Sequence, residues 1–348
     1  MILKSLSPFS LVLSLSLSLF GQIALAGDCS PKDMSAELGA VRSQGNIGWC
    51  YANTAADLIS YKFRKNWNGT QASAIFIALG YNYKMNSSEP GSYIFTEGGD
   101  IRAAINYAAE FGYSCPRPLD NLFVLGGFNL QIKQKLHIAE KLKSLFDNRL
   151  NSSEGWKAYR DYIYELQQKQ SIVSRISEEA LENALRLNIN LAVVEIAKEV
   201  CKPFKDLMPM SLVKSDIGRY FDTDTEYYDD VLKMRIKQKP DLMNLIDRQI
   251  TAENVVGIDY AIKLISPDLK DSDSHASVVV GREMRAGQCY YKIRNSWGPE
   301  CGFEDETGKF IPRYNNKVEC VDGHVWVKAA DLKANVSAIA YIKNQSGL

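Results

Sequence analysis

The strongest constraint on the fold is a set of reactive side chains that the sequence divides between two distant segments. Gln44 and Cys50 lie in the first, which reads QGNIGWCYA, and His275 and Asn295 lie in the second, more than two hundred residues later. A thiol becomes a strong nucleophile only when it loses its proton, and an imidazole is a suitable acceptor. A fold that uses these groups together must bring the beginning and the end of the chain face to face.

Cys50 stands at the start of a stretch with the apolar spacing of an α-helix. Small and apolar residues recur from Ala52 to Phe63 at helical intervals. A helix that begins at Cys50 places the thiol near positive helix-end amides. We therefore predict that Cys50 is a nucleophile, that His275 accepts its proton, and that Asn295 orients the imidazole.

In their order and local context, these residues resemble the papain-like cysteine peptidases. The resemblance implies an α+β fold of two lobes, a helical lobe facing a β-barrel lobe, with the active site between them. It implies that the Gln44 side chain and the backbone N–H of Cys50 donate hydrogen bonds to the developing oxyanion. It implies neither a cofactor nor a metal.

A third segment agrees with the resemblance. Gly98 and Gly99 precede another helical run, as does a glycine pair in the family, where the backbone pairs with extended substrate. Trp297, in the sequence NSWG, is expected to border the substrate and to shield the histidine–asparagine bond from water.

Three positions depart from the family pattern. Ile47 stands where the family has a cysteine, Trp49 where a small residue is expected, and Cys301 where a tryptophan often stands. The first departure removes a disulfide beside the nucleophile, and the last alters the leaving-group side of the cleft. None of them removes a catalytic group.

Composition excludes other classes of function. The 348 residues have a formal net charge of +0, which argues against a nucleic-acid-binding protein. The three histidines show no metal-ligand spacing, and no phosphate-binding or dinucleotide motif is present. A peptide or protein substrate is the expected partner, and the sequence gives no indication of the oligomeric state.

Residues 1–26 have the pattern of a signal peptide, with Lys4, an apolar run and a small-residue cleavage site at Ala24-Leu25-Ala26. We therefore expect an exported protein, either secreted or periplasmic, in which disulfides can form. Six cysteines other than Cys50 allow fifteen connectivities, and a local pair flanking a turn-rich segment is favoured, Cys301 with Cys320. The six are Cys29, Cys115, Cys201, Cys289, Cys301 and Cys320.

The chain divides by its hydrophobic patterns into three parts after the signal peptide. Residues 27–120 form a lead-in and a helical lobe, 121–250 a helical insertion, and 251–348 a β lobe with short apolar strands. The insertion is interpreted either as a packed helical elaboration or as a lid over the cleft.

Two alternatives to a peptidase remain at this point. A catalytically inactive relative would bind peptides or a partner, and an acyl or γ-glutamyl transferase would use the same Cys–His–Asn site. Whether water or an amine takes the acyl group separates the hydrolase from the transferase.

Overall fold

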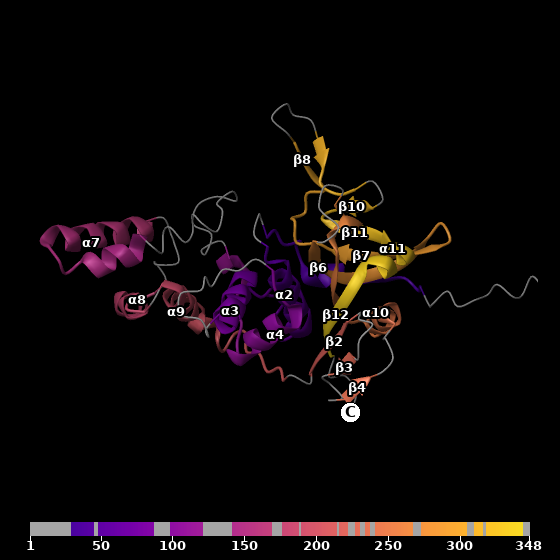
Figure 1. The fold of residues 1–348 in the computed structure, drawn as a ribbon, viewed down its shortest axis with the longest axis horizontal. Helices are drawn as coiled ribbons and strands as arrows, with labels where there is room; N and C mark the ends of the chain where they lie inside the picture. The colour runs from indigo at the N-terminus through magenta and orange to yellow at the C-terminus, as the bar shows by residue number, and fades with distance from the viewer. Residues whose placement is uncertain are drawn as a thin grey trace, which may run out of the picture.

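The structure is a computed structural model, and it describes residues 29–44, 48–86, 98–120, 141–168, 176–187, 189–213, 216–221, 227–229, 234–236, 241–266, 273–304, 310–315 and 318–343. The predicted signal peptide lies outside these residues. A helical lobe and a β lobe lie side by side in Figure 1, with the insertion beyond the helical lobe. The predicted α+β fold, with helices facing a sheet, is confirmed.

The helical lobe is built around α2 (Cys50–Phe63), which is buried along almost its whole length. Alanines at three of its positions allow close packing on several sides. Around it pack α3 (Ala74–Asn86) and α4 (Ile101–Glu110), and short 3-10 turns cover Ser35–Leu38 and Arg117–Leu119. The start of α4 is fixed by Asp100, whose carboxylate accepts from Ala103 N at 2.7 Å.

The β lobe is one antiparallel sheet in the order β10-β11-β7-β6-β5-β12-β2, with β1 paired to β6. Six of its strands, β5, β6, β7, β10, β11 and β12, lie within residues 251–348, where short apolar strands were predicted. The strands are β1 (Lys32–Asp33), β2 (Ile217–Phe221), β5 (Val256–Ala261), β6 (Ser274–Arg285), β7 (Gln288–Arg294), β10 (Glu319–Val321), β11 (His324–Lys328) and β12 (Val336–Ile342).

Smaller elements complete the described chain. Among the described residues, no helix is long and apolar enough to cross a membrane. The remaining helices are α7 (Ser153–Gln168), α8 (Glu178–Leu185), α9 (Ile189–Cys201), α10 (Leu242–Thr251) and α11 (Ala329–Asn335), with 3-10 turns at Lys202–Phe204 and Ile262–Leu264. The remaining strands form two hairpins, β3 (Tyr227–Asp229) with β4 (Met234–Ile236), and β8 (Gly302–Glu304) with β9 (Phe310–Pro312).

A glycine lets the two lobes meet closely. Gly257 lies on β5 against α2, where an added Cβ would stand 3.0 Å from Thr54 Cγ2 and 3.1 Å from Leu58 Cδ1. Those distances are tighter than ordinary van der Waals contact, so a larger residue would push the helix away from the sheet. The close approach places the first turn of α2, with Cys50, against the β lobe.

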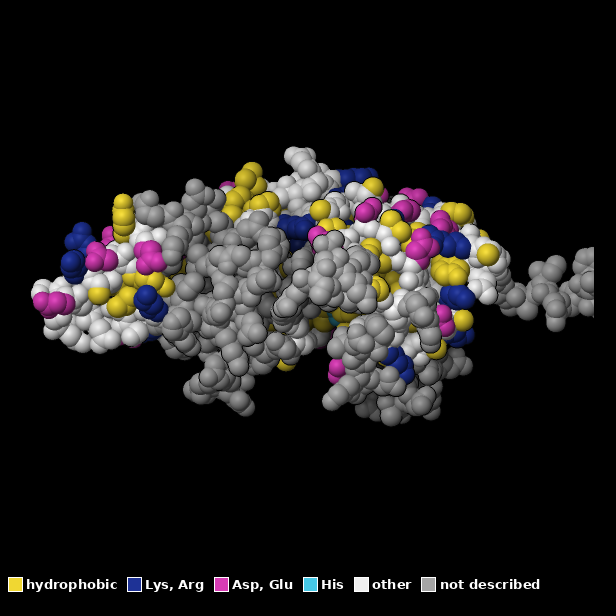
Figure 2. Space-filling model, turned by 90° about the horizontal axis from the view of Figure 1, so that it is seen from above, with side chains coloured by type: hydrophobic (Ala, Val, Ile, Leu, Met, Phe, Trp, Pro, Cys, Tyr) yellow, Lys and Arg dark blue, Asp and Glu magenta, His cyan; other side chains and the backbone are white. Residues whose placement is uncertain are grey.

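Three described helices of the insertion, α7, α8 and α9, lie on the side of the helical lobe away from the sheet. Helix α9 packs on α3 through a small apolar cluster, and α7 and α8 form a separate cluster further out. Figures 1 and 2 both place α7 at the end of the molecule opposite the β lobe. These described helices therefore agree with a packed elaboration and not with a lid.

The last part of the segment 121–250 differs from the helical prediction. Residues 217–221 form β2, which pairs with β12 at the edge of the sheet, and α10 packs on the sheet's other strands. The strand is short, with the sequence IGRYF, and it has too few residues for an alternating pattern to be recognised. This part of the segment therefore belongs to the β lobe.

Three disulfides tie the chain together, and all six cysteines other than Cys50 are in them. The predicted local pair, Cys301–Cys320, is confirmed. A second disulfide joins the lead-in to β7, and a third joins the end of α9 to the helical lobe, which anchors the insertion. These two are Cys29–Cys289 and Cys115–Cys201.

We expect the native, unreduced protein to contain one thiol that iodoacetamide alkylates, at Cys50, because the other six cysteines are in disulfides. Intact mass before and after alkylation measures this number, and reduction in denaturant should raise it to the seven cysteines of the sequence. Two or more adducts on the unreduced protein would contradict this pairing.

Candidate active site

Cys50 lies at the first position of α2, beside the strand that carries His275. The residue before it, Trp49, offers no side-chain cap to the helix, so the amides of the first turn are available to the thiol. The backbone amides of Ala276, Tyr51 and Cys50 lie close enough to the thiol to favour its charged form. Because Ala276 directly follows His275, the structure brings together the two ends of the chain that the sequence predicted to meet.

Burial raises the pKa of the Cys50 thiol above its ordinary value, and Asp259 on β5 raises it further. The backbone amides of Ala276 and of the first turn of α2 oppose this rise but do not reverse it. The resting group is therefore a thiol, which needs a base to remove its proton.

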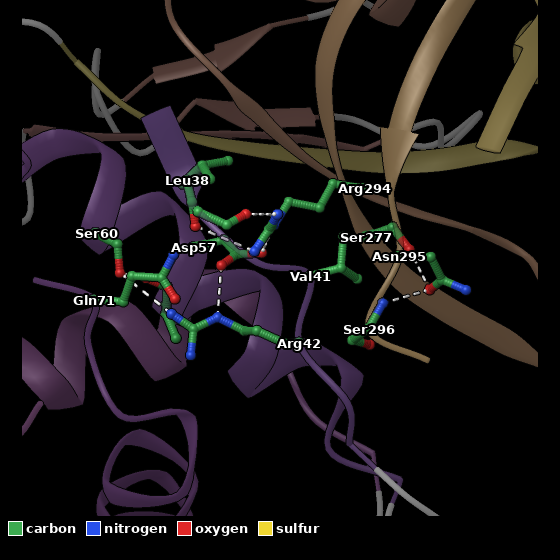
Figure 3. Close-up of polar contacts among 12 residues, drawn as sticks. Leu38, Val41, Arg42, Asp57, Ser60, Gln71, Ser277, Arg294, Asn295 and Ser296 are labelled. Carbon is green, nitrogen blue, oxygen red and sulfur yellow. Dashed lines mark hydrogen bonds and ion pairs between the residues drawn. The ribbon is translucent and has the colours of Figure 1, made fainter. Parts of the chain in front are cut away.

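The imidazole of His275 is held by Asn295. Its Nε2 lies 2.7 Å from Asn295 Oδ1. The same oxygen accepts from the backbone N–H of Ser296 at 2.9 Å and from Ser277 Oγ at 3.1 Å (Figure 3). A backbone N–H is always a donor, so the contact identifies this atom as the amide oxygen and not the nitrogen.

This assignment fixes the tautomer of His275. Since Asn295 Oδ1 can only accept a hydrogen bond, His275 Nε2 carries the proton and donates the hydrogen bond. Nδ1 is then the ring nitrogen with a lone pair, and it is the one that can take a proton from a thiol. Asn295 Nδ2 in turn donates to Tyr314 O–H at 3.1 Å, which holds the amide in this orientation.

Aromatic rings enclose the histidine, which is 4% exposed. The ring of Trp297 lies 5.0 Å from the imidazole and stacks on Tyr314 at 5.5 Å, and Tyr260 meets the imidazole edge-on at 5.7 Å. Burial lowers the pKa of His275 to about 4, although the bond to Asn295 acts in the opposite direction. The imidazole is therefore neutral, and able to accept a proton, throughout the physiological pH range.

Sequence reasoning missed three of these supporting residues: Tyr260, Ser277 and Tyr314. A signal was present for Ser277, which lies two positions after His275 and so shares its face of β6. Tyr260 is the cross-strand partner of His275, and its hydroxyl bonds Ser277 Oγ at 3.0 Å. Strand register decides that pairing, and the sequence alone does not reveal it.

Gln44 lies beside the residue that follows Asn295. Its backbone N–H donates to Ser296 O at 2.8 Å, and its side-chain Oε1 accepts from Ser296 Oγ. With the amide oxygen turned toward Ser296, the nitrogen is the end that can donate elsewhere. Residues 45–47, which connect Gln44 to the loop before Cys50, lie outside the described residues.

Gly98 and Gly99 lie next to the nucleophile loop. Gly98 N donates to Gly48 O at 2.8 Å, and its φ of +80° is in the region that favours glycine. A Cβ on Gly99 would stand 2.8 Å from the ring of Tyr51, so this position also requires glycine. Both glycines are exposed, and their backbone is accessible to an extended ligand.

Among the described residues, no group of three or more histidine, cysteine, aspartate or glutamate side chains is arranged to hold a metal ion. The groups that the described residues do bring together are a thiol, a neutral imidazole and nearby amide donors. A thiol with an oriented base and an amide donor is a constellation for acyl transfer.

Solved structures with a similar chain path include PepW from Lactobacillus rhamnosis HN001, with 14% identity, a TM-score of 0.48, and coverage of 97% of this chain and 89% of that one. Procathepsin L 3 from the larval midgut of Tenebrio molitor gives 12% identity and a TM-score of 0.43, with coverage of 93% of this chain and 72% of that one. A structure from work on the mite allergens Blo t 1 and Der p 1 gives 13% identity and a TM-score of 0.42, with coverage of 93% of this chain and 74% of that one.

No protein-family model matches the sequence, and no curated protein matches it. Because the TM-scores are below one half and the identities are low, we rest the functional proposal on the geometry of the site and not on these similarities.

We expect the folded protein to lose stability as the pH falls from about 6.5 toward 4. An unfolded histidine has a pKa of about 6.5, whereas burial lowers the pKa of folded His275 to about 4. Between these values the unfolded state binds more protons, so the free energy of unfolding falls by up to about 1.4 kcal/mol per pH unit for this histidine.

Urea unfolding at a series of pH values measures this slope. The His275→Asn variant does not titrate in the window, so its slope should be shallower than that of the wild type. The free energy of unfolding of the variant still depends on pH in this window, because burial also lowers the pKa of His324 to about 4. Equal slopes for the variant and the wild type would contradict the buried neutral state of His275.

Proposed function

We propose that the protein is an exported cysteine peptidase that hydrolyses peptide bonds through a thioester on Cys50. One observation carries the proposal. Helix α2, which starts at the thiol, packs on the strand β6 that carries His275, and Asn295 orients the imidazole so that Nδ1 can accept a proton. The nucleophile, the base and the orienter come from three separate parts of the chain. A chance cluster of core residues would not require the imidazole of His275 to be oriented in this way.

In the first half of the reaction, Cys50 Sγ attacks the carbonyl carbon of the scissile bond while its proton passes to His275 Nδ1. The backbone N–H of Cys50 and Gln44 Nε2 donate to the oxyanion that forms. The imidazolium then gives the proton to the leaving nitrogen, the C–N bond breaks, and the amine departs. The acyl group remains on sulfur as a thioester.

In the second half, water replaces the amine. His275 Nδ1 takes a proton from water as its oxygen attacks the thioester carbon, and the same donors stabilise the second oxyanion. The C–S bond breaks, and the proton returns to Cys50. Cys50 and His275 are both neutral before and after each half-reaction. This suits their buried environment, which disfavours both a thiolate and an imidazolium.

The proposed substrate is an extended peptide or a segment of a protein. The exposed backbone of Gly98 and Gly99 is suited to pairing with such a chain, because no side chain blocks its approach. Trp297 covers the imidazole, and we assign it to the border of the leaving-group side. Its indole would also keep water from the His275–Asn295 bond.

Export is part of the proposal. The signal-like pattern of residues 1–26 supports it, and so do three disulfides, since such bonds persist in an oxidising compartment. A secreted or a periplasmic location would satisfy both observations.

Turnover of a fluorogenic peptide library tests the proposal. A peptidase should release the fluorophore and leave a free carboxylate on the acyl fragment, as mass spectrometry would detect. In a parallel reaction with glycylglycine, a transferase would instead give mainly the extended peptide. Binding of peptides without any turnover would support an inactive relative and contradict the proposal.

A further inference from the structure

Asp57 is a buried carboxylate at a point where three chain segments meet. Its Oδ1 accepts from Arg42 Nε at 2.5 Å and its Oδ2 from Arg294 Nε at 2.8 Å (Figure 3). The three side chains are only 6%, 2% and 0% exposed. We propose that Asp57 is a positioning residue for the active site and acts through these two arginines; the proposal rests on the peptidase function proposed above.

Each of the three segments carries a different group of the site. Helix α2 carries Cys50 about two turns before Asp57. The lead-in carries Gln44 two residues after its arginine, and β7 is followed directly by Asn295. One carboxylate therefore connects the nucleophile, the oxyanion donor and the side chain that orients the imidazole.

The arginines also fix the backbone of the lead-in. Arg294 donates to the carbonyl oxygens of Gly39 at 2.8 Å, Ala40 at 2.5 Å and Leu38 at 3.3 Å. A guanidinium presents its donors in a rigid plane, so these bonds and the bond to Asp57 cannot shift independently. A displacement of α2 relative to β7 must break some of them.

The carboxylate remains charged under working conditions. Burial alone would raise the pKa of Asp57, but the guanidiniums of Arg294 and Arg42 hold it below its ordinary value. Such buried ion pairs are weak contributors to stability, because desolvation offsets much of the attraction. Fixed geometry between the segments is the property that the charged network supplies and an apolar cluster would not.

A substitution that keeps the shape of the side chain tests this role. Asp57→Asn removes the charge, and we expect kcat to fall about 10- to 100-fold with KM changed less than about threefold, because a displacement near 1 Å can cost about 100-fold. The rate at which iodoacetamide alkylates Cys50 should change as well. That rate is a readout that does not require turnover.

Asp247→Asn is the matched control. Asp247 pairs with the fully buried guanidinium of Arg282 at 2.5 Å and accepts from the Tyr291 hydroxyl at 2.7 Å, so it joins α10 to the part of β6 remote from His275 and to the middle of β7. We expect it to lower the urea midpoint while kcat stays within about twofold of wild type. A loss of kcat equal to that of Asp57→Asn would overturn the proposal.

The triple variant Arg42→Met, Asp57→Leu, Arg294→Met separates positioning from stability, and it decides the question if Asp57→Asn does not fold. It leaves no uncompensated charge, although three lead-in carbonyls lose their donors, so we expect its urea midpoint to be closer to wild type than that of Asp57→Asn while kcat stays at least about tenfold lower. Wild-type kcat in this variant would overturn the proposal. If the wild type itself hydrolyses no peptide, the proposed function fails, and the alkylation rates of Cys50 still decide whether Asp57 positions the thiol.

Discussion

Cys50→Ala is expected to abolish peptide hydrolysis, with a loss in kcat of at least about 10⁴-fold, because no other group can form the thioester. The fold should be retained, since Cys50 takes part in no disulfide and alanine fits the space. Initial rates with a fluorogenic peptide measure the loss, and urea unfolding measures the stability.

Cys50→Ser is the matched control for this experiment. It keeps a nucleophilic atom in place but replaces the thiol with a hydroxyl, which is far less acidic. Rates close to those of Cys50→Ala, at an unchanged urea midpoint, would assign the loss to the missing thiol. Turnover at the wild-type rate by either variant would rule out Cys50 as the nucleophile.

His275→Ala is expected to lower kcat by about 10⁴-fold, while Asn295→Ala should cost less, about 10- to 100-fold. The histidine moves the proton itself. The asparagine selects the tautomer, and the rings of Tyr260 and Trp297 still restrict the imidazole when it is gone.

The control for these variants is His324→Gln. His324 is also buried, and its Nδ1 contacts the backbone oxygen of Asp322 at 3.1 Å and not a catalytic side chain. Its replacement should leave kcat within about twofold of wild type. Loss of activity in His324→Gln together with normal turnover by His275→Ala would show that His275 is not the base.

The segments that meet at the candidate site could be predicted from the sequence because they depend on local patterns. The small residues that follow Cys50 indicate a helix that starts at the thiol, and the apolar runs around His275 and before Asn295 indicate strands. These three elements need no knowledge of distant contacts, and the structure brings their predicted segments together.

The supporting contacts could not be predicted, because they depend on how distant segments pack. Tyr260 faces His275 only in one register of β5 on β6, and Tyr314 reaches Asn295 from a separate loop. Asp57 reads as an ordinary polar residue of α2 until the two arginines are in place. The position of the insertion is likewise set by the packing of α9 on α3.

The central claim is that Cys50 is an activated nucleophile, and reaction with an epoxide inhibitor of cysteine peptidases tests it most directly. We expect one equivalent of inhibitor to add to the native, unreduced protein, and peptide mapping to place it on Cys50. The reaction should be lost in His275→Ala, because the thiol then has no proton acceptor. Modification of any other residue, or labelling of Cys50 at the same rate without His275, would contradict the account.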